Sequence, residues 1–210
     1  MNKPGVLHIR DSIIVGSPEK LIVGQINELN GVYDFYFCSY FRNSEVAKEL
    51  TSLGIRVLNV PFTRWCPISA IVALRKLIRD YDIKLICCHD YKSNFLGIIS
   101  GKTLGIPVVS VFHGRTSHDL KLRCYEAIDN FILRGFEKVI AVSEASKSKL
   151  IDLGIGAEKI EVVCNAVELQ KQNKCISSKE LRKELSISKE DETFAQPAEK
   201  CHLSYLYQEN

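Results

Sequence analysis

The sequence predicts an α/β fold, a doubly wound and mostly parallel sheet with helices on both faces. Short apolar runs rich in β-branched residues recur along the chain, and a segment with helical periodicity follows each of them. Two runs, Leu85–Cys88 and Val108–Phe112, are apolar at nearly every position, which is typical of parallel strands covered on both faces. Strands that alternate with helices in this way build a parallel sheet with helical crossovers.

The expected elements follow one another up to Asn165. The strands are Val6–Arg10, Tyr33–Tyr40, Ile55–Val60, Lys84–Cys88, Pro107–Phe112, Lys138–Val142 and Ile160–Cys164. The helices between them are Pro18–Leu29, Ser44–Leu53, Ile68–Tyr81, Tyr91–Leu104, His118–Arg134 and Ala145–Leu153. Gly54 and Gly105 come just after helical patterns, where glycine suits a left-handed cap, and Ser143 precedes the last helix as a candidate N-cap.

The chain has 210 residues, of which 46% are hydrophobic and 25% charged, and this composition excludes disordered, collagen-like and coiled-coil proteins. Two full-sized domains would be cramped, so we expect one domain. Lysine and arginine number 28 against 25 acidic residues, a net charge of +3. A nucleic-acid-binding face would be more basic, so we expect no nucleic-acid partner.

The eight cysteines include no CxxC pair, and Cys87 and Cys88 lie inside an apolar run. We interpret them as buried thiols and expect no metal site. The N-terminus lacks the long apolar stretch of a secretory signal, and every apolar run is far shorter than the ~20 residues that cross a bilayer. We therefore expect a cytoplasmic protein without a transmembrane span.

The character of the chain changes after Asn165. Residues 171–192 are polar and dense in charge, with one short helical pattern at Ser178–Leu185, and this predicts a linker. The last stretch, Thr193–Asn210, is too short for a domain, and we expect it to be poorly ordered.

Ligands of an open parallel sheet bind beyond the carboxyl ends of the strands, where loops and helix N-termini converge. Nearly every predicted strand exit is polar or carries glycine. The exits are Asp11-Ser12 with Gly16-Ser17, Ser39-Tyr40, Pro61–Arg64, His89–Lys92, His113–Arg115, Ser143-Glu144 and Asn165. His8 lies within a predicted strand and not at an exit, so the case for a site depends on His89 and His113.

Each candidate has an alternative interpretation. Gly16 leads into a helix N-terminus that favours an anionic or hydroxyl-bearing ligand, or it is a plain turn glycine. Its loop has neither GxGxxG nor GxxxxGK[ST] spacing, which argues against NAD and ATP. One interpretation of His113, beside Gly114, is that it binds a sugar hydroxyl or a phosphate. The alternative is that it is a structural histidine. Asp90 and the pair Ser143-Glu144 are candidates for a ligand-binding site. The alternative is that they only cap the N-termini of the helices that follow.

The helix after Trp65 carries Arg75, Lys76 and Arg79 among apolar residues. This mixture suits an anionic membrane surface, so peripheral contact with the inner face of a membrane is one interpretation. Core packing is the other, because a helix of this fold already buries one face on the sheet.

Taken together, the exits resemble the N-terminal domain of the family 4 retaining glycosyltransferases, which have the GT-B fold. The resemblance runs from about Val6 to Val167. Its pieces are Leu7–Asp11 with Gly16–Lys20, His89–Asn94, Gly105–Val109 with His113-Gly114, Val139–Glu144, and Ile160 to Asn165-Ala166-Val167.

In that family two Rossmann-like domains face each other across a cleft, the first mainly holding the acceptor and the second the nucleotide-sugar. The resemblance implies that His113 is catalytic, that Gly16 and Ser17 lie near the donor phosphates and that Asn165 lies at the hinge. It also implies retention of configuration, with the nucleotide-sugar as co-substrate and neither metal nor cofactor. The further substrate-proximal candidates are His89, Asp90, Lys92, Gly114, Arg115, Ser143 and Glu144.

The chain departs from the family pattern in three places. It has Gly16-Ser17 where the family often has two glycines, and Asn165-Ala166 where it has Asn-Gly. The donor-binding domain is expected to be absent, and Pro197–Lys200 looks like a relic of it. We therefore expect an acceptor-side domain at residues 1–168 and, at 169–210, a linker with the vestigial start of the missing domain.

Three functions follow from this expectation. The first is an acceptor-side domain of a sugar transferase, inactive alone, with a saccharide or lipid-linked saccharide as acceptor. The second is a binding or scaffold module that pairs with a separate donor-domain chain. The third is a decayed remnant.

Overall fold

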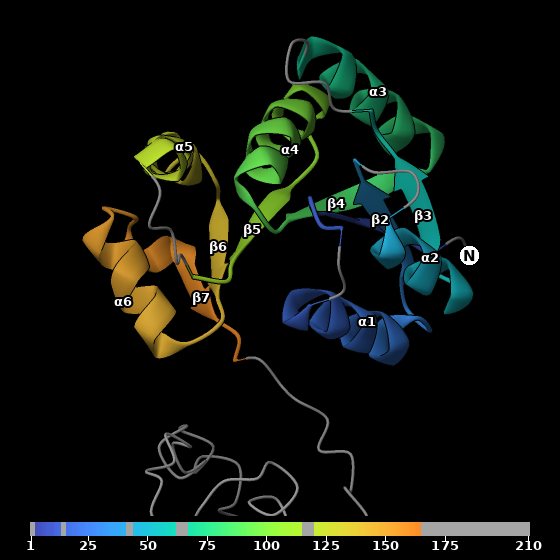
Figure 1. Cartoon of the computed structure of the whole chain (residues 1–210), viewed down its shortest axis with the longest axis horizontal. Coiled ribbons are helices and arrows are strands. Elements are labelled where there is room, and N and C mark those ends of the chain that lie inside the picture. Colours follow the sequence, from blue (N-terminus) through green and yellow to red (C-terminus); the bar gives the residue numbers. More distant parts are fainter. Residues whose placement is uncertain (1–2, 14–15, 41–43, 62–66, 115–119, 165–210) are drawn as a thin grey trace, which may run out of the picture. The chain divides into compact units, whose positions relative to one another are not determined.

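The computed structural model describes residues 3–13, 16–40, 44–61, 67–114 and 120–164, and side chains within these ranges except 120–124. Strands and helices alternate along the chain (Figure 1). The strands are β1 Gly5–Ile9, β2 Asp34–Ser39, β3 Arg56–Asn59, β4 Ile83–Cys88, β5 Val108–Phe112, β6 Lys138–Ala141 and β7 Ile160–Val162. The helices are α1 Ser17–Leu29, α2 Glu45–Ser52, α3 Pro67–Asp80, α4 Tyr91–Leu104, α5 Leu120–Leu133, α6 Glu144–Asp152 and the short 3-10 helix η1 Ala157–Lys159.

All the strands pair in parallel, in the order β3-β2-β1-β4-β5-β6-β7. The doubly wound α/β prediction is confirmed. The order runs outward from β1 in both directions, so the chain leaves β1 toward β2 and leaves β4 toward β5. The loops after β1 and β4 therefore separate, and such a switch point is where open α/β sheets bind ligands.

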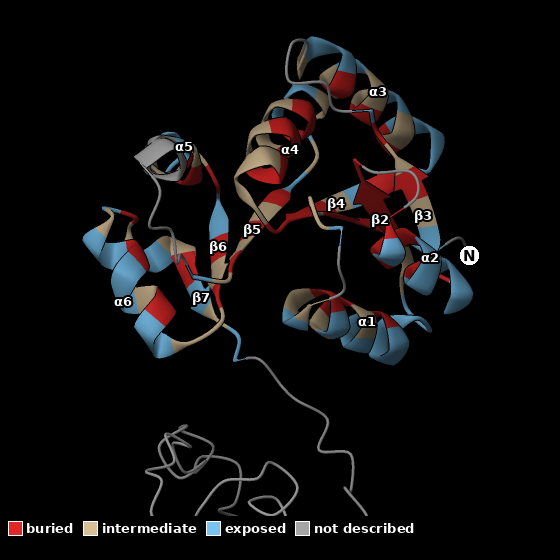
Figure 2. Cartoon of the chain, in the orientation of Figure 1, coloured by how far each residue is buried: buried red, intermediate tan, exposed pale blue. Residues whose placement is uncertain are grey.

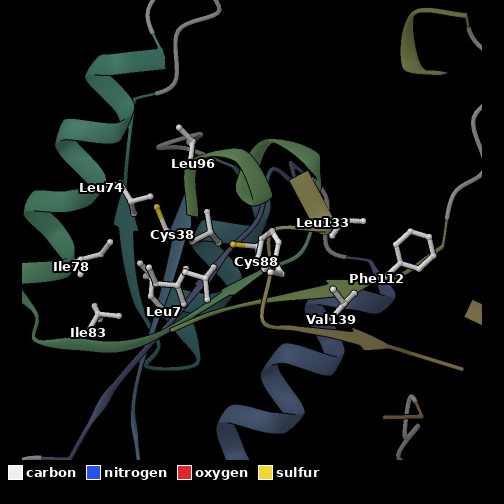
Figure 3. Packing of buried hydrophobic residues seen from close by; sticks show 14 of the residues in the cluster. Leu7, Cys38, Leu74, Ile78, Ile83, Cys88, Leu96, Phe112, Leu133 and Val139 are labelled. Atoms are coloured by element: carbon white, nitrogen blue, oxygen red, sulfur yellow. The ribbon is translucent and has the colours of Figure 1, made fainter. Parts of the chain in front are cut away.

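Two apolar clusters lie on opposite faces of the sheet. In Figure 1, α1 lies on one side of the sheet, and α3 and α4 lie on the other. The larger cluster joins the sheet to α3, α4, α5 and α6, with Leu74, Leu96, Leu133 and Leu150 as buried contributions from those helices (Figure 3). The smaller cluster joins α1 and α2 to Phe37 of β2.

Helix α4 packs very closely against β4 and β5. A Cβ atom built on Gly97 would lie 2.3 Å from Cys88 Sγ, and one built on Gly101 would lie 2.1 Å from a methyl carbon of Val108. These two glycines let the helix backbone approach the sheet, which explains why they are needed inside a helix despite the poor helix propensity of glycine.

Strand β5 corrects one expectation. Val108 and Phe112 lie in the core, while Val109 and Val111 between them are partly exposed. Figure 2 shows that β5 carries both buried and half-buried residues. The prediction that this strand is covered on both faces is wrong within the described residues. Strands β4 to β7 advance in one direction, and right-handed crossovers then place α4, α5 and α6 on one face of the sheet.

The buried-thiol interpretation holds for the cysteines within β2 and β4. Cys38, Cys87 and Cys88 are free and buried, and burial raises the pKa of the Cys38 and Cys87 thiols to about 12. Cys164, also free, is exposed. The described helices include none that is both long enough and apolar enough to cross a bilayer.

Candidate functional site

Side chains from the carboxyl ends of β1, β4 and β5 meet at the switch point. His89 and His113 come directly after β4 and β5, and Arg10 and Asp11 come directly after β1. The first turn of α1 adds Glu19, and the first turn of α4 adds Lys92 and Ser93. The polar exits predicted from the sequence are therefore partly brought together, by the three adjacent strands in the middle of the sheet.

Three histidines form a hydrogen-bonded row across these strands. Nδ1 of His8 lies 3.0 Å from Nε2 of His89, and Nδ1 of His89 lies 3.2 Å from Nε2 of His113. The centroids of consecutive rings lie 5.3 and 5.5 Å apart, and the ring planes are inclined to each other by 25° and 21°. His8 is thus part of the site, although the sequence analysis set it aside as a residue within a strand.

Strand geometry explains how His8 reaches the site. Side chains alternate between faces, so His8 points away from the core that holds Leu7 and Ile9. His8 pairs with Cys87 in the parallel register, and His89 lies two residues further on the same face of β4. The alternation and the strand order together were the signal that could have identified it.

The row is uncharged near neutral pH. Burial lowers the pKa of His8 and of His113 to about 4. Burial also lowers the pKa of His89 well below its ordinary value, and the neighbouring His8 and His113 add to this effect. A neutral imidazole donates through one nitrogen and accepts through the other, so each ring can serve both of its neighbours.

An ion pair between Arg10 and Glu19 lies beside the histidines. Arg10 also donates to the carbonyl oxygen of His89 over 3.4 Å, and the second carboxylate oxygen of Glu19 accepts from the N–H of Gly16 over 2.8 Å. Burial of Glu19 opposes its ionisation, but Arg10 and the backbone donors outweigh it and hold the pKa of Glu19 below its usual range. This pair ties the loop before α1 to the exit of β4.

This arrangement refines the role of Gly16. Its φ of −113° is open to any residue, so left-handed geometry is not the reason for glycine here. Its N–H is occupied by Glu19, three residues further along, and Ser17 is the first residue of α1. Arg10 and Glu19 were missed by the sequence analysis, although an acidic residue three positions after the residue preceding a helix is a known capping pattern.

A second polar group connects β1 to α4. Asp90 caps the helix, its Oδ1 accepting from the N–H of Lys92 over 3.0 Å and from that of Ser93 over 2.9 Å. Its Oδ2 accepts from the N–H of Asp11 over 2.7 Å, and Lys92 pairs with the Asp11 carboxylate. Burial raises the pKa of Asp90. The capping interpretation of Asp90 is confirmed, and its carboxylate also fastens the exit of β1.

The remaining candidates lie elsewhere or have a local role. Gly114 follows His113 with φ of +88°, a left-handed conformation that favours glycine. Ser143 caps α6 by accepting from the N–H of Ser146 over 3.1 Å, and Glu144 is exposed in the first turn. Within the described ranges, no contact joins either residue to the histidine row. Arg115 and Asn165 lie outside the described residues.

The site is built for hydrogen bonding. Neutral imidazoles can exchange hydrogen bonds with hydroxyl groups, while each of the two cations is paired with a carboxylate, Arg10 with Glu19 and Lys92 with Asp11. The histidines bond to one another in a line and do not converge on one point. In the part of the chain that the structure describes, no group of three or more histidine, cysteine, aspartate or glutamate side chains is arranged to hold a metal ion.

The fold resembles solved structures of glycosyltransferases and of a protein bound to UDP-glucose. HepE from Anabaena in complex with UDP-glucose superposes with a TM-score of 0.69 at 18% identity, over 87% of this chain and 50% of that one. A glycosyltransferase from Rickettsia africae superposes with a TM-score of 0.68 at 16% sequence identity, over 90% of this chain and 51% of that one. The lipopolysaccharide outer core galactosyltransferase WaaB superposes with a TM-score of 0.62 at 16% sequence identity, over 80% of this chain and 47% of that one. The chain therefore spans about half the length of these proteins.

The sequence itself carries the family signal. A search of curated proteins found no match. The model of Glycosyltransferase Family 4 matches residues 29–171, which is more than half of the chain and includes β2 to β7 with His89 and His113. The parallel sheet, the polar group at its switch point and this match agree, and the chain belongs to glycosyltransferase family 4.

Proposed function

We propose that this chain supplies the acceptor side of a glycosyltransferase that uses a nucleotide-sugar donor and retains the anomeric configuration. The observation that carries the proposal is the row His8–His89–His113 at the switch point of a family 4 fold, flanked by Arg10 and Lys92. Neutral hydrogen-bond donors and acceptors of this kind suit sugar hydroxyls. Two structures of one solved relative, HepE, support a nucleotide-sugar donor, since one holds UDP-glucose and the other holds UDP with glucose.

Within this proposal the residues have different roles. His113 faces the reacting centre, and Gly16, Ser17 and Gly114 lie next to the donor and acceptor groups. His89, Asp90 and Lys92 serve the acceptor side, and Arg115, Ser143 and Glu144 remain candidates only through the family resemblance. For Asn165 the proposal keeps the hinge role that the family resemblance implies, and for the chain it keeps an acceptor domain at 1–168 followed by a linker segment at 169–210.

We further propose that the 210 residues bind a saccharide but do not transfer a sugar by themselves. Transition-state stabilisation in a two-domain transferase draws on groups from both walls of the cleft. These 210 residues span about half the length of the solved relatives, so in this proposal they contribute the groups of one wall. The acceptor is a saccharide or a lipid-linked saccharide of polysaccharide or lipopolysaccharide assembly, as the name of WaaB suggests for that relative.

The proposal is tested by titrating the purified chain with acceptor oligosaccharides and with UDP-glucose, using NMR shifts for binding and release of UDP for turnover. We expect saccharide binding without turnover. His113→Asn and Lys92→Met should each weaken binding about tenfold, which corresponds to ~1.4 kcal/mol. Lys138→Met is the matched control, because Lys138 also forms an ion pair, 2.6 Å from Glu161, but at the amino ends of the strands. Turnover by the chain alone would refute its inactivity, and equal effects of the two lysine variants would refute the site.

A second candidate is a binding module that pairs with a separate donor-domain chain. The partly exposed face of β5, with Val109 and Val111, favours it, because such a surface is free to bury apolar area on a partner. Mixing the chain with the separately produced donor half of HepE and following sedimentation would test it. A stable complex with restored turnover supports this candidate, and two independent species oppose it. Absence of saccharide binding together with low stability would instead indicate a decayed remnant.

Membrane contact at the cytoplasmic face is favoured by one feature of α3. Ala70, Leu74 and Ile78 are buried, as the core-packing interpretation predicts, yet Ile68 and Val72 are 69% and 61% exposed. They continue into Lys76 and Arg79 along the exposed side of the helix.

Co-sedimentation with vesicles containing phosphatidylglycerol tests this contact. The double variant Ile68→Ser/Val72→Ser should lose binding, and Ile128→Ser/Phe131→Ser on α5, at side chains 58% and 76% exposed, should keep it. Equal loss in both would indicate nonspecific adsorption.

A further inference from the structure

We propose that His8, His89 and His113 act as one tautomeric unit, in which His89 holds the proton and the ring of His113 in place and His8 does the same for His89. His8 and His89 are then positioning residues for the group that the proposed function places at the reacting centre. The inference deepens that proposed function and depends on it only for the ligand that His113 meets.

The nitrogen atoms that meet in the row determine which nitrogen of each ring carries the proton. Each of the two hydrogen bonds joins Nδ1 of one ring to Nε2 of the next. His89 uses both of its nitrogens and carries a single proton when neutral, so it donates to one neighbour and accepts from the other. The whole row is then oriented head to tail. Either all three rings carry the proton on Nδ1, or all three carry it on Nε2.

Neutrality is supported by the surroundings of the row. His8 and His89 are only 4% and 7% exposed, and Arg10 next to His89 disfavours an added positive charge. Glu19 is the nearby anion, and it is already paired with Arg10. Burial and these neighbours keep the pKa of each ring far enough below 7 for the neutral form to dominate.

The buried end of the row keeps the orientation from reversing. Reversal requires one proton to leave at one end and one to enter at the other, the ends being Nε2 of His8 and Nδ1 of His113. Nε2 of His8 is buried and meets no hydrogen-bonding partner among the described residues. Because no described group there can take up or supply a proton, we expect the orientation set on folding to persist. His113 therefore offers its ligand a fixed donor or a fixed acceptor at Nδ1, and it does not discharge a proton through the row.

The direct test is long-range 1H–15N NMR of the histidine rings in the 210-residue chain, with each ring assigned from single His→Asn variants. We expect His8, His89 and His113 each to show one tautomer, the same in all three, unchanged between pH 6 and pH 8. Mixed tautomers, rapid averaging at His113 in the native chain, or a doubly protonated ring at pH 7 would overturn the inference.

A variant of His89, the middle ring, tests whether the hydrogen bonds and not the packing of the side chains fix the tautomer of His113. His89→Leu removes both hydrogen bonds while keeping an apolar side chain of similar volume, and His113 should then average between its tautomers. Phe35→Leu is the matched control, since the Phe35 ring contacts His8 at a centroid distance of 5.8 Å without a hydrogen bond. The control should leave the His113 tautomer unchanged. If His89→Leu does not fold, the native spectrum still decides.

The two proposals fail in different ways. Identical tautomers in a chain that binds no saccharide refute the proposed function and leave the inference standing. Saccharide binding by a chain with mixed tautomers refutes the inference and leaves the proposed function standing.

Discussion

The two faces of the central strands differ in chemistry although neighbouring residues of the same strands supply them. On β1, Leu7 and Ile9 point into the larger apolar cluster, while His8 between them points to the opposite face. At the ends of β4 and β5, Cys88 and Phe112 belong to that cluster, and the next residue in each case is a histidine of the row.

This difference shows how one alternating strand serves two purposes. The face toward α3 to α6 gains stability from apolar burial and close packing. The opposite face buries imidazoles, which form hydrogen bonds with one another. Burial lowers their pKa values, so it favours the neutral form of each ring. We therefore expect the two faces to respond to different perturbations. The predictions below are ordered by the expected change in the free energy of unfolding.

Acidification should give the largest loss, and it acts on the histidine face. His8 has a pKa of about 4 when folded against an ordinary value of 6.5, so below pH 6.5 the unfolded chain binds a proton that the folded chain does not. Stability is complete above pH 6.5 and falls as the pH drops toward 4, by about 3 kcal/mol from this residue alone. Urea unfolding at pH 7.0 and 4.5 measures it. His8→Phe should flatten the dependence, and equal stability at both pH values would contradict the neutral row.

Gly101→Ala should give the next loss, and it acts on the apolar face. The new methyl group would lie 2.1 Å from Val108 and 3.0 Å from the carbonyl oxygen of Ile106, so α4 must move away from β5. Overpacking of this kind costs about 2 kcal/mol. Urea unfolding at pH 7 gives the value.

The control for Gly101 lies in the helix on the other face. Gly24, exposed in α1, has open space where a Cβ would be added. Gly24→Ala should stabilise the chain by about 0.5–1 kcal/mol because alanine is the better helix former. If both alanine variants shift stability in the same direction, close packing of α4 is not the cause.

Lys92→Met should cost about 1 kcal/mol, since it removes the partner of a carboxylate whose side chain is only 15% exposed. The control, Lys138→Met, breaks an ion pair whose side chains are 47% and 60% exposed, and it should cost less than about 0.5 kcal/mol. Chemical unfolding of the two variants side by side measures the difference. A larger loss at Lys138 would mean that the carboxyl edge of the sheet is not the more tightly coupled one.

His113→Asn should have the smallest effect on stability, below about 0.5 kcal/mol, because His113 is half-buried at the end of the row and forms one hydrogen bond within it. Its effect should instead appear in saccharide affinity. A melting temperature close to that of the native chain, together with weaker binding, would separate function from stability on this face. A large loss of stability would make His113 a structural residue.

Much of the site could be predicted, because it depends on where strands end. The alternation of apolar runs and helical patterns places His89, Asp90, Lys92 and His113 at exits, and the structure brings them to one edge. Ser143 and Glu144 follow β6, one strand further out, and share no described contact with them. Strand exits in a sequence do not say which exits are neighbours.

The residues that sequence analysis missed depend on contacts across the sheet. His8 enters the site because β1 lies beside β4 in a register that pairs His8 with Cys87. Arg10 and Glu19 meet because the first turn of α1 lies beside the end of β1, where Arg10 also reaches the carbonyl oxygen of His89 after β4. The partial exposure of β5 has the same origin, since strand order and crossover handedness decide which face receives helices.

The local pattern of this chain was enough to determine its elements, its doubly wound class and its family, because hydrophobic periodicity and helix ends are encoded over short stretches. Only the tertiary structure decided that His8 of β1 and the two histidines that directly follow β4 and β5 would bond in a row. That outcome depends on the register and order of strands that are far apart along the chain, and no short stretch of sequence contains this information.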